Sequence, residues 1–118
     1  MYSGKLKDDH LDRLFAAVLT LRNVEECYQF FEDVCTVAEL KAMAQRLAVA
    51  GMLGEDCTYG DITRGTGAST ATISRVKKCL NYGADGYRLV LSRLKTSEDP
   101  ADQGRTGRDG SGGRKDGR

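Results

Sequence analysis

The sequence predicts an all-α, multi-helix domain that contains a helix-turn-helix and is followed by a disordered C-terminal tail. Apolar residues recur at spacings of three and four through most of residues 7 to 95, and a single glycine separates two short periodic segments within residues 58 to 81. After Leu94 no large apolar residue follows, and Gly, Arg and Asp dominate. We therefore expect one folded domain over residues 1–95 and a disordered, solvated tail over residues 96–118. The tail's arginines could slide along phosphates, but the interspersed aspartates weaken that alternative.

Two helices are expected in the first third of the chain. The first covers Lys7 to Leu21, and the second begins at Asn23, which with Glu26 forms a start similar to a capping box. The apolar stripe of the first helix consists of Leu11, Leu14, Phe15, Val18 and Leu19, and the apolar body of the second consists of Cys27, Tyr28, Phe30, Phe31 and Val34. The aromatic cluster could line a ligand pocket, but we favour a core or a dimer seam.

The third and longest helix is expected to begin after a capping box formed by Thr36 and Glu39 and to run to about Leu53, with Gly54 as its stop. We expect its buried side to hold Leu40, Met43, Leu47, Ala48 and Val49 or Ala50, and its outward side to hold Lys41, Gln45 and Arg46. The alanines and Gly51 would let another helix approach closely. This pattern suits a central helix that crosses its mate in a homodimer, which would supply burial that so short a chain lacks.

The helix-turn-helix is expected over Thr58 to Asn81. Thr58 is a suitable N-cap, with Asp61 near the positive end of the helix dipole, and Ser69 is a suitable cap for the second helix. Gly67 would form the turn, because a positive φ costs glycine least.

The apolar spacing also predicts which way the second helix faces. Its stripe of Ile73, Val76 and Leu80 should pack on Ile62 of the first helix. The opposite side then holds Ala71, Ser74, Arg75 and Lys78, with Thr70, Thr72 and Lys77 on its flanks, and we call these seven residues the reading face. Small residues near the helix start allow close approach to base edges in the major groove of double-stranded DNA, while the cations can meet phosphates or guanine. A merely solvated helix is one alternative, and a helical interaction module that docks on an acidic partner protein is another.

A last helix is expected over residues 86–95, after Asn81, Gly83 and Gly86. Its apolar residues are Tyr87, Leu89, Val90, Leu91 and Leu94. A helix this short needs docking to persist, so we expect it to be buried rather than to form a free arm.

Composition argues against several other classes of protein. The four cysteines, Cys27, Cys35, Cys57 and Cys79, form no C-x-x-C pair, and His10 is the single histidine, so we expect no metal site and no Cys/His nucleophile. We expect Cys27, Cys35 and Cys79 to be buried and Cys57 to lie in a loop. No paired-carboxylate site or phosphate-binding loop is recognisable, which argues against an enzyme. No hydrophobic signal segment or membrane span is evident, so we expect a cytoplasmic protein.

Two stretches carry a resemblance to a known family. GTGASTATISRVKKCLNYG, with AELKAMAQRLAVAGMLGED before it, resembles the tryptophan repressor (TrpR) superfamily, and within it most resembles the TrpR-related YerC/YecD branch. The most specific part, residues 67 to 75, is similar to G-A-G-I-A-T-I-T-R at the start of the repressor's reading helix. The resemblance implies an intertwined homodimer that regulates transcription, as a repressor, by binding operator DNA. Its base-proximal positions would be Thr70, Ala71, Thr72 and Ser74.

The corepressor pocket transfers less well by this resemblance. Arg75 matches an arginine that holds the ligand carboxylate, but the glycine after it is replaced by Val76, whose isopropyl group would occupy the place of the indole. The second ligand arginine falls on Gln45, and other pocket positions fall on Cys35 and Cys79. We therefore expect no tryptophan cofactor, and the sequence names no other effector.

Overall fold

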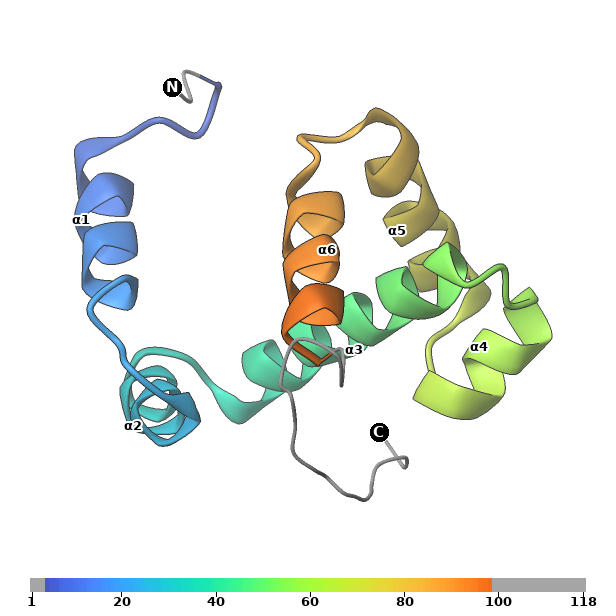
Figure 1. Cartoon of the computed structure of the whole chain (residues 1–118), viewed down its shortest axis with the longest axis horizontal. Helices are drawn as coiled ribbons and strands as arrows, with labels where there is room; N and C mark the ends of the chain where they lie inside the picture. The colour runs from blue at the N-terminus through green and yellow to red at the C-terminus, as the bar shows by residue number, and fades with distance from the viewer. Residues whose placement is uncertain (1–3, 99–118) are drawn as a thin grey trace. The chain divides into compact units, whose positions relative to one another are not determined.

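The computed structural model describes residues 4–98, and it contains six α-helices and no strand over that range, which confirms the all-α prediction (Figure 1). The helices are α1 (Asp9–Val18), α2 (Val24–Val34), α3 (Val37–Gly54), α4 (Tyr59–Thr66), α5 (Thr70–Tyr82) and α6 (Gly86–Glu98). The tail predicted to be disordered lies outside the described residues, apart from its first three. These three residues continue α6, and the domain limit at residue 95 stays a prediction.

The chain forms two compact units that divide between Met43 and Ala44, within α3. The N-terminal unit holds α1, α2 and the first part of α3. The C-terminal unit holds the rest of α3 together with α4, α5 and α6. Each unit is described below by itself.

Helix α1 is shorter than the predicted Lys7 to Leu21 because both of its ends are closed by local hydrogen bonds. The Asp8 carboxylate accepts from the backbone N–H of Leu11 at 3.0 Å, so the helix begins at Asp9. At the other end the N–H groups of Thr20 and Leu21 donate to carbonyls three residues back, which tightens the last turn.

Helix α2 begins at the predicted cap. The Asn23 side chain accepts from the N–H of Glu26 at 2.9 Å. The Glu26 carboxylate accepts from the backbone N–H of Arg22 rather than from that of Asn23, so the capping box is incomplete. The rings of Phe30 and Phe31 meet edge to face with centroids 5.2 Å apart. No residue of α1 or α2 is fully buried, so the described residues form no closed core here, and the dimer seam stays a prediction.

Helix α3 begins with the predicted capping box. The Thr36 hydroxyl accepts from the N–H of Glu39 at 3.1 Å, and the Glu39 carboxylate accepts from the N–H of Thr36 at 2.8 Å. Hydrogen bonding of the Glu39 carboxylate by the Thr36 backbone, and next by the Thr36 side chain, holds the pKa of Glu39 below its ordinary value. The helix ends at Gly54 as expected. In the loop that follows, the residue with a left-handed backbone is Asp56, with φ 62°.

The predicted buried side of α3 is correct for only some of its residues. Val49 and Ala50 are both fully buried, whereas Met43 and Ala48 are exposed. Leu40 and Leu47 are half-buried.

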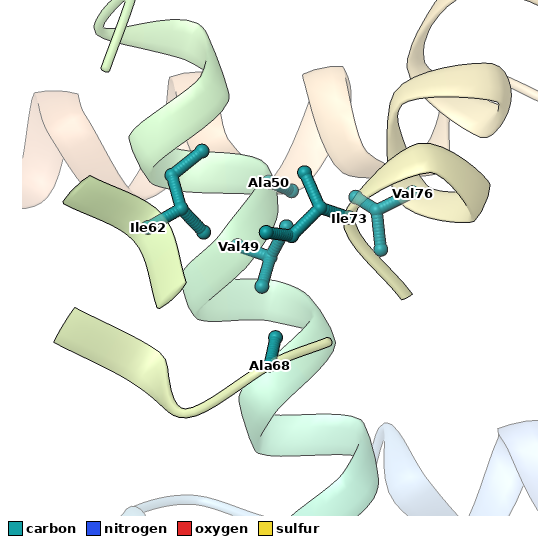
Figure 2. Close-up of a cluster of buried hydrophobic side chains, with 6 residues drawn as sticks. All are labelled: Val49, Ala50, Ile62, Ala68, Ile73 and Val76. Atoms are coloured by element: carbon teal, nitrogen blue, oxygen red, sulfur yellow. The ribbon is translucent and has the colours of Figure 1, made fainter. Parts of the chain in front are cut away.

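The core of the C-terminal unit is built on α3. Figure 2 shows Val49 and Ala50 of α3 with Ile62 of α4 on one side and the α5 residues on the other. Its buried residues are Val49, Ala50, Ile62, Ala68, Ile73 and Val76. The α5 residues Ile73 and Val76 thus share one buried cluster with Ile62, and α3 supplies the surface on which both helices rest.

Helix α6 packs on this core along one side only. Tyr87 and Leu91 are half-buried against it, and Leu91 faces Gly51, where a Cβ would lie 3.8 Å from the leucine Cδ2. The Arg88 Nε donates to the Leu80 carbonyl at 3.0 Å and ties α6 to α5. Leu89, Val90 and Leu94 on the other face are exposed in the single chain, and their burial by a partner chain stays a prediction.

The cysteines differ from expectation. Cys79 is exposed, because Ile73, Val76 and Leu80 occupy the side of α5 that meets the core. Cys27 and Cys35 are half-buried rather than buried. Cys57 lies in the loop before α4, as predicted.

Candidate nucleic-acid interface

Helix α4 begins at a complete capping box. The Thr58 hydroxyl accepts from the N–H of Asp61 at 3.1 Å, and the Asp61 carboxylate accepts from the N–H of Thr58 at 3.4 Å. Hydrogen bonds from the hydroxyl and then the backbone of Thr58 hold the pKa of Asp61 below its ordinary value, with a smaller contribution from the nearby Arg64 guanidinium. The start of α4 is therefore fixed by Thr58 and Asp61, the two residues predicted from the sequence to begin this helix.

The turn between α4 and α5 consists of residues 67 to 69. Gly67 has φ 76° and ψ 5°, and its N–H donates to the Thr63 carbonyl at 2.8 Å. The Thr66 hydroxyl donates to the Ile62 carbonyl at 2.8 Å and accepts from the N–H of Ala68 at 3.1 Å. The Ala68 side chain is buried in the core, so the turn is held both by these hydrogen bonds and by packing.

Helix α5 begins after Ser69, whose hydroxyl accepts from the N–H of Thr72 at 3.1 Å, as predicted. Ile73 and Val76 are at most 1% exposed and set the rotation of the helix about its axis. The opposite side of α5 consequently points away from the core.

The structure leaves most of the reading face exposed. Six of its seven residues are exposed: Thr70, Ala71, Ser74, Arg75, Lys77 and Lys78. Thr72 is half-buried, and its hydroxyl accepts from the Ser69 hydroxyl at 3.2 Å. None of the three cations pairs with a carboxylate of the described residues, so their charges are available to an anionic partner.

Sequence reasoning missed two residues of this region. Gln45 was expected to point outward, but it is half-buried, and its amide donates to the Thr66 carbonyl at the end of α4. Tyr59, the first residue of α4, contacts two residues of the reading face: its hydroxyl lies 3.5 Å from the Ser74 hydroxyl, and its ring centroid lies 5.9 Å from the Lys77 Nζ. No local pattern signals either contact, because each joins residues that are 15 or more positions apart.

Tyr59 and Lys77 also border a hollow of about 590 Å³ where the loop after α3 meets α5 and α6. Its lining includes apolar Leu53 and Leu80 and the charged Asp56 and Arg88. The hollow therefore adjoins the reading face.

The positions that would bind tryptophan by resemblance have other roles here. Val76 is 1% exposed and belongs to the core, and Gln45 is engaged with Thr66. Within residues 4–98 no three His, Cys, Asp or Glu side chains gather to bind a metal ion. The described helices are also too short or too polar to cross a membrane.

The fold and this region together define a helical protein with a helix-turn-helix that presents a small-residue and cationic face. The sequence pattern of the Trp repressor protein family matches residues 9–95. The chain therefore belongs to the Trp repressor family.

Relatives agree with this assignment. The uncharacterized protein YerC of Bacillus subtilis (strain 168) is 55% identical over 98 residues, which cover 83% of this chain and 94% of YerC. A crystal structure from Staphylococcus aureus, of a protein provisionally named a Trp repressor, has a TM-score of 0.74 at 54% identity over 77% of this chain and 91% of its own. A TrpR-like protein from Eubacterium eligens ATCC 27750 has a TM-score of 0.74 at 56% identity, over 76% and 93% of the two chains.

Proposed function

We propose that this protein is a sequence-specific double-stranded DNA-binding transcriptional regulator, a repressor, that acts as a cytoplasmic homodimer and has no enzymatic activity. The observation that carries the proposal is the reading face of α5, which is directed away from the core by Ile73 and Val76 and whose three cations have no carboxylate partner among the described residues. Membership of the Trp repressor family supports the same function.

The distribution of residue types along α5 suits a major groove. Thr70 and Ala71 at the start of the helix are short enough to bring the backbone close to base edges. Arg75 and Lys78, one to two turns further on, can reach phosphates or guanine. We infer that the first residues provide sequence preference and that Lys77 and Lys78 mainly provide affinity.

The apolar surface of the N-terminal unit supports the homodimer. Leu19, directly after α1, is 84% exposed, and Tyr28 of α2 is 73% exposed, although the apolar spacing predicts that both are buried. A second copy of the chain would cover such surface, as the resemblance implies, and would place two α5 helices about 34 Å apart for successive half-sites of a palindrome.

The test is selection of bound duplexes from a random library by the purified full chain, with an Arg75→Ala, Lys78→Ala double variant alongside and no added ligand. We expect an enriched palindrome that the double variant fails to select. Thr70→Ala should change which bases are preferred more than it lowers the overall affinity. Equal losses on selected and random duplexes would contradict that role for Thr70.

A selection without enrichment would contradict sequence-specific binding by the free protein. It would favour either an effector-dependent regulator or a module that docks on an acidic partner protein. Repeating the selection with cell extract separates these two, since a protein-docking face has no reason to distinguish base edges.

A further inference from the structure

We propose that Tyr59 is a positioning residue for the reading face and that it acts through Ser74 and Lys77. This inference rests on the proposed function, because it concerns how the same face is presented to DNA. Tyr59 itself lies on α4, outside the helix that we expect to enter the groove.

The geometry links three side chains from two helices. Ser74 and Lys77 are three residues apart and therefore lie one turn apart on the same side of α5. The single ring of Tyr59 reaches both, with 3.5 Å between the two hydroxyl oxygens and 5.9 Å between the ring centroid and the Lys77 Nζ. A residue of α4 thus contacts both a predicted base-proximal residue and a predicted phosphate contact.

Tyr59 is suited to this role because its own position is fixed. It is the first residue of α4, directly after the Thr58 cap, and its half-buried ring packs against the hydrophobic core. The side chains that it contacts are exposed, and a free lysine side chain samples many rotamers. Contact with a fixed ring restricts Lys77 before DNA arrives, which lowers the ordering cost of binding.

The chemistry of the contact matters as well. A carboxylate beside Lys77 would also restrict it, but would compete with a DNA phosphate for its charge. An aromatic face attracts an ammonium group through its quadrupole and carries no net charge. Tyr59 can therefore orient Lys77 and leave its full positive charge for the phosphate.

The first test needs no DNA. In NMR spectra of the full chain, the Tyr59 ring should shift the Lys77 Cε protons upfield relative to those of Lys41, an exposed lysine on α3. The shift should persist in Tyr59→Phe and vanish in Tyr59→Leu. An unmodified protein without the shift would show that the contact is absent in solution and would overturn the proposal.

The second test measures coupling on a duplex enriched by the selection described above. We expect Tyr59→Leu to weaken binding about three-fold in the unmodified background and to have a smaller effect in Lys77→Ala, where only the contact with Ser74 is left to lose. Tyr59→Phe should leave the Lys77 contribution intact and lower base discrimination as Ser74→Ala does, without adding to it. Thr63→Ala, an exposed change on the same helix, should leave binding unchanged.

The outcomes separate this proposal from the proposed function. Equal losses from Tyr59→Leu with and without Lys77 would mean that Tyr59 acts independently of Lys77, and would overturn the positioning role. Thermal unfolding of each variant identifies losses that come from a weakened core. An unmodified protein that shows the Lys77 shift but binds no duplex would overturn the proposed function, and with it the role of Tyr59, while the contact itself would stand.

Discussion

The side-chain amide of Gln45 on α3 donates a hydrogen bond to the backbone carbonyl of Thr66, the last residue of α4, at 3.1 Å. The carbonyls of a final helical turn lack partners within the helix, and a half-buried one needs a donor from elsewhere. Gln45 thus joins the helix that builds the core to the end of the first helix of the helix-turn-helix, directly before the turn at Gly67.

The first prediction concerns this bond. Gln45→Ala should lower the free energy of unfolding by about 1 kcal/mol, because the Thr66 carbonyl loses its donor while it remains half-shielded from water. Urea unfolding at a fixed protein concentration measures the change, with the exposed Lys41→Ala as the control. Equal stability of Gln45→Ala and the unmodified protein would mean that water replaces the amide at no cost.

Gly67 is the second test of the turn. Its φ of 76° is strained for any residue with a Cβ, so Gly67→Ala should lower the free energy of unfolding by about 1 kcal/mol or more. Gly54→Ala is the matched control, because a Cβ there meets no atom of residues 4–98 within 4 Å and its φ is not positive. If both variants unfold at the same urea concentration, the positive φ is not what requires glycine at position 67.

The local parts of this fold were predictable from sequence, and the contacts between distant residues were not. Thr58, Gly67 and Ser69 lie where the sequence placed them, because caps and turns depend on neighbours three or four residues away. The ends of α1 were harder to predict, because residues other than Asp8 and Leu21 suit the start and the end of this helix equally well. The exposure of Cys79 depends on which side of α5 meets α3. The spacing of apolar residues within α5 does not show whether a residue at the edge of the apolar stripe is buried or exposed.

The candidate site follows the same division. The seven residues of the reading face come from the period of a single helix, and six of them are exposed as expected. Tyr59 was missed because its role depends on how α4 crosses α5, with 15 residues between it and Ser74. Gln45 was predicted to face outward for the same reason, because its contact with Thr66 depends on how α3 and α4 pack.

The capping box at Asp61 gives a pH-dependent prediction. Hydrogen bonds from Thr58 hold the pKa of Asp61 below its ordinary 3.8, so the ionised carboxylate stabilises the folded chain above that pH. This contribution is lost as the pH falls through the lower pKa of the folded state. Asp61→Asn should therefore be less stable than the unmodified protein at pH 6, and the difference should shrink as the pH falls below 3.8.

Urea unfolding of both proteins from pH 6 to pH 3 measures this difference. Glu32→Gln is the control, because Glu32 is exposed and has no hydrogen-bond partner among the described residues. A stability difference that stays constant with pH would show that Asp61 acts through its shape rather than through its charge.

Lys78 should act as a phosphate contact. It is exposed and has no ion-pair partner among the described residues, so Lys78→Ala should weaken binding to all duplexes alike. Each lost phosphate contact should reduce the slope of log K against log salt by about 0.9. Fluorescence anisotropy between 50 and 200 mM salt measures the slope, with Lys41→Ala as the control. An unchanged slope combined with altered base preference would mean that Lys78 reads bases.

The last prediction is that tryptophan is not the effector. The position where the resemblance would place an indole is Val76, which is buried beside Ile73 in the core, so opening a cavity there would cost packing. The second ligand position is Gln45, whose amide is neutral and already bonded to Thr66. We expect calorimetric titration with millimolar tryptophan to show no binding heat, and the affinity for a selected duplex to be the same with and without it. A tryptophan-dependent gain in DNA affinity would mean that Val76 leaves the core when ligand binds, and the midpoint of thermal unfolding would then rise with tryptophan concentration.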